Sequence, residues 1–150
     1  MNRTSVRSQL LQLRPALQSL DTSYCLIGSA ALVMHGTALD QCEDIDILTD
    51  EHGAQQLARA WRDQWQTSNH AEGHRQFRSE YARYAFAHGI VEVMGALHIR
   101  QQAEWLPVTV NETVEIDGIA VASLAELQRL LTWFGRAKDE EKLNRLAKQS

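Results

Sequence analysis

The sequence predicts an α+β fold, in which a mixed sheet is flanked by helices in a single domain spanning residues 1–150. In the first half of the chain, short apolar runs alternate with segments of helical periodicity. In the second half, two hairpin patterns follow one another. A chain of this length can form one hydrophobic core, and no linker divides it.

Composition restricts the classes of partner. The chain has 15 Lys and Arg residues against 19 Asp and Glu residues, so a nucleic-acid partner is possible but not favoured. No apolar run reaches the ~20 residues that span a bilayer, and the N-terminus lacks the apolar core of a signal peptide. Cys25 and Cys42 do not have the spacing of a disulfide framework. We therefore expect a reduced, cytoplasmic protein without membrane contact.

The first elements are indicated by local patterns. Leucines recur at helical spacing in 5–20, where Pro15 either kinks the helix or marks the first turn of a shorter one. A buried strand is expected at 24–27, and a short helix at 29–35 ends at Gly36. Further elements are expected in order: a strand at 44–48, a helix at 50–65 and a polar loop at 66–75. Trp61 and Trp65 share the apolar stripe of that helix, so both are expected in the core.

The second half contains turn and capping signals. Residues 81–95 are expected to form two strands joined at His88–Gly89, and residues 113–123 a hairpin with Asp117–Gly118 at its turn. Ser123 and Glu126 have the spacing of a reciprocal capping box. A last helix is expected at 138–148, after a break at Gly135.

Two aspartates interrupt the apolar strand at 44–48. Residues i and i+2 of a strand project to the same face, so Asp44 and Asp46 project together, with Cβ atoms about 7 Å apart. Two carboxylates so placed repel each other unless a cation lies between them, and Mg²⁺ prefers such oxygen ligands. The alternative is a pair of solvent-facing residues on an edge strand.

Gly28 and Ser29 stand where a strand ends and a helix begins. The first amides of a helix have no partner within it, and they can bind phosphate oxygens. Glycine allows close approach of the backbone, and the Ser29 hydroxyl either adds a donor or serves simply as the helix N-cap. An anion site beside a carboxylate pair predicts a metal-bound triphosphate as ligand.

The segments "GSAALVMHG" and "DIDIL" resemble the nucleotidyltransferase superfamily, which has the polymerase-beta-like fold. More narrowly, they are similar to the small bacterial branch that includes aminoglycoside and lincosamide nucleotidyltransferases and AbiE-type toxins. The resemblance covers about 24–146 and implies a third carboxylate on a later strand, Glu92 in "GIVEVMG". The segment "GRAKDEEKLNRL" is similar to the helix start of such enzymes, at Arg136, Lys138 and Asp139.

The resemblance also implies a reaction. Asp44, Asp46 and Glu92 would be the catalytic residues and would hold one or two Mg²⁺ ions, with Glu92 able to take the proton of the attacking hydroxyl. The substrate would be an NTP, ATP above all, bound by Gly28, Ser29 and other contacts. A nucleoside monophosphate would pass to a hydroxyl of a small molecule, a protein or a tRNA, releasing pyrophosphate. Because 150 residues leave little room for a second substrate-binding domain, we expect the acceptor either at a homodimer interface or in a shallow cleft.

Basic groups are needed for the rest of the triphosphate or for an anionic acceptor. Arg75, Arg78 and Arg83 lie among aromatic residues just before the Glu92 strand, and Arg78 is assigned to the nucleotide together with Lys138. Their alternative is a solvated surface, and that of Glu92 is an exposed strand residue.

The histidines are weaker candidates. His70 and His74 have a spacing that could suit zinc, but they lie in an expected loop without other ligand-like residues. His35, beside Gly36, is expected to be a cap or surface residue.

Two further classes of function stay open. Relatives often have Arg and Thr where this chain has Asp40 and Cys42, which favours a degenerate module that binds nucleotide or a partner without turnover. A purely structural interaction domain would require the carboxylates of Asp44, Asp46 and Glu92 to point apart. Convergence of these three side chains on one cleft is therefore the deciding observation.

Overall fold

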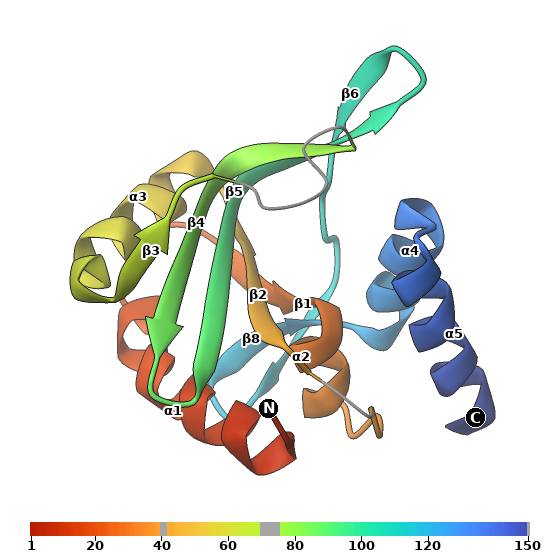
Figure 1. Cartoon of the computed structure of the whole chain (residues 1–150), viewed down its shortest axis with the longest axis horizontal. Helices are drawn as coiled ribbons and strands as arrows, with labels where there is room; N and C mark the ends of the chain where they lie inside the picture. Colours follow the sequence, from red (N-terminus) through yellow and green to blue (C-terminus); the bar gives the residue numbers. More distant parts are fainter. Residues whose placement is uncertain (40–41, 70–75, 150) are drawn as a thin grey trace.

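The computed structural model describes residues 1–39, 42–69 and 76–149, and it confirms the α+β class (Figure 1). The strands form one eight-stranded sheet in the order β3-β4-β5-β2-β1-β8-β7, with β6 paired to β5. The strands are β1 (Tyr24–Ile27), β2 (Asp44–Thr49), β3 (Trp65–Thr67), β4 (Phe77–Phe86), β5 (Gly89–Gln101), β6 (Glu104–Pro107), β7 (Thr113–Ile116) and β8 (Ile119–Ala122).

The sheet is mixed. Strands β2 and β5 pair in parallel, as do β1 and β8, whereas the other pairs are antiparallel. In the central parallel pair, Asp46 lies opposite Glu92. The topology therefore brings together two carboxylates that are far apart in the sequence.

The helices lie on both sides of this sheet (Figure 1). They are α1 (Arg3–Gln18), α2 (Gly28–Met34), α3 (Glu51–Ala60), the 3₁₀ helix η1 (Arg62–Gln64), α4 (Leu124–Phe134) and α5 (Ala137–Gln149). Helices α1 and α3 pack together and against the sheet, whereas α4 and α5 form a separate antiparallel pair. Within the described parts of the chain, no helix combines the length and the apolar character needed to cross a bilayer.

Helix α1 begins earlier than a proline-initiated helix would. Asn2 is its N-cap and accepts a hydrogen bond from the Ser5 amide at 2.8 Å. Pro15 lies within the helix, so the alternative of a shorter helix beginning there is wrong. The predicted leucine stripe is confirmed at its first three positions, since Leu10, Leu13 and Leu17 are buried, whereas Leu20 lies beyond the helix and is partly buried.

The elements around the paired aspartates form as predicted. Strand β1 leads directly into α2, and Gly36 follows that helix with a φ of +92°, in the left-handed region that favours glycine. On β2, Ile45 and Ile47 are fully buried, whereas Asp44 and Asp46 project to the other face. The alternation in the sequence thus separates a core face from a face that lines a cavity.

The expected helix at 50–65 is wrong in its second half, because α3 ends at Ala60. Trp61 is buried, with its ring at 5.4 Å from both Tyr84 and Phe86. The chain then turns, and Trp65 enters β3, which pairs with β4 at the edge of the sheet. The Trp65 side chain is 53% exposed, so its expected place in the core is wrong. The predicted loop also begins later, because β3 extends to Thr67.

The two hairpins are confirmed, with longer strands in the first. Strands β4 and β5 turn at residues 87–88, one residue before the predicted position. In the second, Asp117 and Gly118 have φ values of +53° and +79°, as a two-residue hairpin turn requires. Strand β6, which the sequence analysis did not predict, continues the far end of β5 as a protruding hairpin (Figure 1).

The capping box at the start of α4 forms only in part. The Ser123 hydroxyl accepts a hydrogen bond from the Glu126 amide at 3.2 Å, as predicted. The Ser123 amide, however, donates to the Glu112 carbonyl at 3.0 Å, so it does not bind the Glu126 carboxylate. That carboxylate instead accepts bonds from the Asn111 amide and from Arg129. The reciprocal bond was therefore a wrong prediction.

Candidate active site

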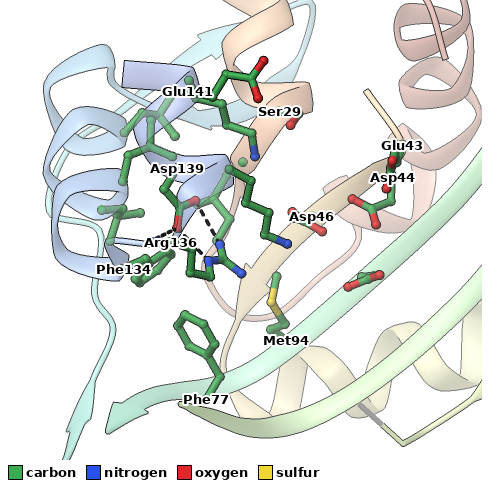
Figure 2. Close-up of a pocket in the computed structure, with 18 of the residues that line it drawn as sticks. Ser29, Glu43, Asp44, Asp46, Phe77, Met94, Phe134, Arg136, Asp139 and Glu141 are labelled. Carbon is green, nitrogen blue, oxygen red and sulfur yellow. Dashed lines mark hydrogen bonds and ion pairs between the residues drawn. The ribbon is translucent and has the colours of Figure 1, made fainter. Parts of the chain in front are cut away.

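A cavity of about 620 Å³ lies between the sheet and the α4–α5 pair (Figure 2). Its walls come from β2, β4, β5, α2, α4 and α5, together with neighbouring residues. The sequence-predicted residues that line it are Gly28, Ser29, Asp44, Asp46, Glu92, Arg136, Lys138 and Asp139. The fold thus gathers residues from four separate segments around one space.

Three carboxylates converge at one end of this cavity. Asp44 and Asp46 project from β2, and Glu92 projects from the neighbouring β5. One oxygen from each of the three lies within 4.8 Å of the others. Figure 2 shows the Asp44 and Asp46 carboxylates directed into the same space. A purely structural interaction domain was expected to have these three carboxylates pointing apart, so their convergence disfavours that alternative.

The environment of Asp46 disfavours its ionised form. Burial raises the pKa of Asp46 well above its usual value, and the negative charges of Asp44 and Glu92 raise it further. Lys142 and Lys138 act in the opposite direction. A bound cation would relieve the repulsion that remains.

Glu92 has a perturbed pKa for the same reasons. Burial is the largest cause, followed by the Asp44 charge and a hydrogen bond with Asp44, and together they raise the pKa of Glu92 to about 7. Two neighbours on β4 partly compensate: an Arg83 Nη1 lies 3.6 Å from Glu92 Oε1, and Tyr81 forms a side-chain hydrogen bond with the carboxylate. Burial and the Glu92 charge raise the pKa of Tyr81 as well, so its hydroxyl stays protonated and donates. A carboxyl group with a pKa near neutrality can accept a proton during a reaction.

The donor set fits a hard divalent cation. All three side chains offer carboxylate oxygens, the ligands preferred by Mg²⁺, and none offers sulfur or nitrogen. Their mutual repulsion in the protein alone gives a cation a further reason to bind there.

Gly28 is in direct contact with this group. Its φ is +72°, and a Cβ atom added to it would lie 2.6 Å from Asp46 Oδ2. A side chain at this position would displace the carboxylate, so the site requires glycine both for its conformation and for its lack of volume. Ser29 lies in the first turn of α2 and lines the cavity, whereas the N-cap is Ile27. The N-cap alternative for Ser29 is therefore wrong.

Helix α5 supplies positive charge opposite the carboxylates. Lys138, Lys142 and Arg145 all line the cavity, and two of them were not singled out from the sequence. Spacings of four and three residues place these side chains on one face of a helix. That periodicity, counted from Lys138, was the signal available in the sequence.

Arg136 and Asp139 form a pair that begins α5. Arg136 Nε lies 2.6 Å from Asp139 Oδ2, and Arg136 Nη2 lies 3.0 Å from Asp139 Oδ1. Asp139 is fully buried and also accepts a bond from the Arg136 amide at 3.1 Å. The Arg136 guanidinium further lies over the rings of Phe77 and Phe134, at 5.1 and 5.5 Å from their centroids. Figure 2 shows this group on one wall of the cavity.

The arginines before β5 lie in different places. The Arg78 guanidinium lies over the Trp105 ring, 4.7 Å from its centroid, and Arg78 is not among the residues that line the cavity. Arg83 contacts Glu92 instead. Arg75 lies outside the described residues. Tyr81, which sequence reasoning missed, forms a side-chain hydrogen bond with Glu92, although the strand register places Tyr81 opposite Met94.

Among the described residues, the group of three carboxylates includes neither His35 nor Cys42. His35 is the C-cap of α2, and its Nε2 lies 2.8 Å from the Ala122 carbonyl oxygen. His70, His74 and Asp40 lie outside the described residues. Cys42 is buried, and its thiol donates to the Asp44 carbonyl at 3.4 Å. It therefore contacts the backbone of the aspartate strand.

The chain is similar to known proteins in structure. No protein-family model and no curated protein sequence matches the chain. A presumed nucleotidyltransferase from Thermotoga maritima has a TM-score of 0.78 and 24% sequence identity, over 100% of this chain and 97% of the other. The lincosamide antibiotic adenylyltransferase LnuA, solved with lincomycin bound, has a TM-score of 0.63 and 13% identity, over 93% and 95% of the two chains. The antibiotic-resistance factor ANT(2″)-Ia has a TM-score of 0.56 and 11% identity, over 89% and 73%.

These likenesses establish the class of fold. The chain has the fold of the nucleotidyltransferase superfamily, as its motifs predicted. LnuA and ANT(2″)-Ia share this fold with the chain.

Proposed function

We propose that this protein transfers a nucleoside monophosphate from an NTP to a hydroxyl acceptor and releases pyrophosphate. The observation that carries the proposal is the convergence of Asp44, Asp46 and Glu92 in one cavity of a nucleotidyltransferase fold. Mg²⁺ held by these three carboxylates would orient the reactants and offset the charge that develops on the attacking and leaving oxygens.

The triphosphate of the NTP would be bound by residues of α2 and α5. Gly28 leaves room for the Asp46 carboxylate, and Ser29 offers a hydroxyl donor for a phosphate oxygen at the start of α2. Lys138 and Lys142 neutralise the charge of the β- and γ-phosphates, a role assigned to them in place of Arg78 because they line the cavity. Compact ammonium groups suit this purpose.

Glu92 receives the proton of the acceptor hydroxyl on a carboxylate oxygen. Its pKa of about 7 belongs to the metal-free protein, and a bound Mg²⁺ would lower it, so the carboxylate is ionised and able to accept a proton near neutral pH. The contacts from Arg83 and Tyr81 hold the carboxylate in place. The acceptor oxygen then bonds to the α-phosphorus as the bond to pyrophosphate breaks.

The alternative of a degenerate binding module makes a different prediction for the same residues. It requires nucleotide binding without transfer. The retention of all three carboxylates and of Gly28 favours the enzyme, because nucleotide binding alone does not need a carboxylate able to take a proton.

The test is transfer of label from α-labelled ATP, with Mg²⁺, to a panel containing lincomycin, an aminoglycoside and tRNA. Asp46→Asn should lower the rate by about a thousandfold or more, because loss of a metal-binding carboxylate removes several kcal/mol of transition-state stabilisation. The matched control is Asp63→Asn, which changes an exposed aspartate in η1 and should leave the rate unchanged. Transfer by Asp46→Asn at the unaltered rate would contradict the assignment of Asp46 as a catalytic, metal-binding residue. ATP binding in calorimetry without transfer to any acceptor would support the alternative of a binding module.

A further inference from the structure

The cavity has a second end whose lining is apolar. Phe77, Met94 and Leu97 come from the sheet side, and Leu130, Leu131 and Phe134 come from α4. These six residues are here called the apolar chamber. Four of them are buried: Phe77, Leu97, Leu130 and Leu131. A ligand that enters the chamber therefore leaves water and contacts hydrocarbon on both sides.

The apolar chamber begins beside Glu92 and leads away from the carboxylates. Met94 follows Glu92 by two residues on β5, so both project to the same face. On β4, Phe77 lies four residues from Tyr81, a separation of about 13 Å along a strand. Figure 2 shows Phe77 and Phe134 on the opposite side of the cavity from Asp44.

The charged group at this end is already neutralised. Arg136 is paired twice with the buried Asp139 and stacks on Phe77 and Phe134. Its guanidinium therefore presents a flat surface next to the chamber, with its charge matched by a carboxylate. A phosphate chain gains little here, and a polyamine would lose its hydration without a counter-charge.

The nucleotide contacts lie toward other elements. Gly28 and Ser29 belong to α2, which follows β1, and Lys138 and Lys142 belong to α5. In the sheet, β2 lies between β1 and β5, so Asp46 separates the α2 side from the Glu92 side. The apolar chamber thus extends from the residue that would receive the proton of the acceptor.

We propose that the apolar chamber binds the hydrocarbon body of the acceptor, so that the substrate is an alcohol with an apolar chain or ring and without a cationic group at that end. The proposal rests on the proposed function. In the step it describes, the alcohol oxygen bonds to the α-phosphorus, the bond from that phosphorus to pyrophosphate breaks, and the hydroxyl proton passes to Glu92.

Methyl NMR tests the chamber without requiring turnover. The sequence has three methionines, so ¹³C-methyl labelling gives one signal each for Met1, Met34 and Met94. Hexan-1-ol should shift the Met94 signal in a saturable way and leave Met34, which is partly buried on α2 outside the cavity lining, unchanged. Butan-1-ol should bind about tenfold more weakly, because two fewer methylenes are buried. Hexane-1,6-diol, of equal length, should also bind more weakly, since its second hydroxyl would be desolvated. Absence of a Met94 shift would overturn the proposal.

A competition experiment separates the acceptor from the nucleotide. With saturating ATP and Mg²⁺, the dissociation constant of hexan-1-ol should stay within about threefold of its value without ATP, which corresponds to a change of under 1 kcal/mol in the binding free energy. An increase in proportion to the ATP concentration would show that the chamber holds the nucleobase, and would overturn the proposal.

Two variants complete the test. Met94→Gln should weaken hexan-1-ol binding about tenfold, measured by saturation transfer to the alcohol, whereas Met34→Gln should not. With ATP and Mg²⁺, hexan-1-ol should receive labelled nucleotide. Failure of ATP to bind in calorimetry overturns the proposed function and with it the acceptor assignment. Binding of ATP without a Met94 response to alcohol overturns the chamber alone.

Discussion

The carboxylate group should make the metal-free protein less stable as the pH rises. Glu92 has a pKa of about 7 in the folded protein against a usual value of 4.5, so the folded state binds its proton more tightly than the unfolded state. For such a group, stability is highest below pH 4.5 and is lost progressively as the pH rises to about 7. Asp46, whose pKa is also raised, contributes in the same direction. Glu92→Gln removes one of the charges and should stabilise the metal-free protein at pH 8.

The magnitude follows from the pKa of Glu92. A rise from 4.5 to about 7 corresponds to about 3 kcal/mol against the ionised form above pH 7. This value already includes the opposing effect of Arg83, whose Nη1 lies 3.6 Å from Glu92 Oε1. The glutamine oxygen can still accept the hydrogen bond from Tyr81. We therefore expect a gain of up to about 3 kcal/mol in the free energy of unfolding.

Urea denaturation with EDTA at pH 5, 6, 7 and 8 measures this effect. The free energies of unfolding of the unaltered protein and Glu92→Gln should differ least at pH 5 and most at pH 8. The free energy of unfolding of Glu92→Gln should change less with pH. The control is Glu80→Gln, which changes an exposed glutamate of β4 and should follow the unaltered protein. Adding Mg²⁺ at pH 8 should stabilise the unaltered protein more than Glu92→Gln, because ligands that bind the folded state stabilise it. A Glu92→Gln protein that is no more stable at pH 8, or that retains the full pH dependence, would refute the repulsion argument.

Two further predictions concern the nucleotide side of the cavity. Gly28→Ala should lower the free energy of unfolding by more than the ~1–2 kcal/mol that a left-handed conformation costs an alanine, and it should abolish transfer, because the new methyl group would displace the Asp46 carboxylate. The control is Gly36→Ala, at a φ of +92° with open space around it, which should show only the conformational cost in the same urea titration. Lys142→Gln should raise KM for ATP at least about tenfold, because it loses a charged phosphate contact worth about 1.5–3 kcal/mol. Lys148→Gln, at an exposed position in the last turn of α5, should leave KM unchanged, and equal effects of the two would contradict the assignment.

The sequence was informative wherever a local rule was sufficient. The alternation of Asp44 and Asp46 with buried isoleucines defined both faces of β2, since the side-chain period of a strand is fixed by its backbone. The Asp117–Gly118 turn and Ser123 as N-cap followed from backbone conformations that few residue types favour. Gly28 and Asp46 were both named, although their contact was not.

The errors arose where a distant partner decided the outcome. The periodicity of α3 continues to Trp65, but pairing with β4 takes that residue into an edge strand. Glu126 has the spacing of a capping box, yet the Asn111 amide and Arg129 bind its carboxylate. The position of Arg78 also depends on a distant partner, because its guanidinium lies over the Trp105 ring of β6, and Arg78 is not among the residues that line the cavity.

The sequence by itself determined most of the elements and the two faces of β2, and together with the family resemblance it indicated the three carboxylates. Only the tertiary structure decided that Glu92 lies opposite Asp46, that Lys142 faces the same cavity, and that this cavity continues into an apolar end. The physical reason is that periodicity and backbone preference act over a few neighbouring residues. Strand register and helix packing, in contrast, join segments whose separation along the chain leaves no local trace.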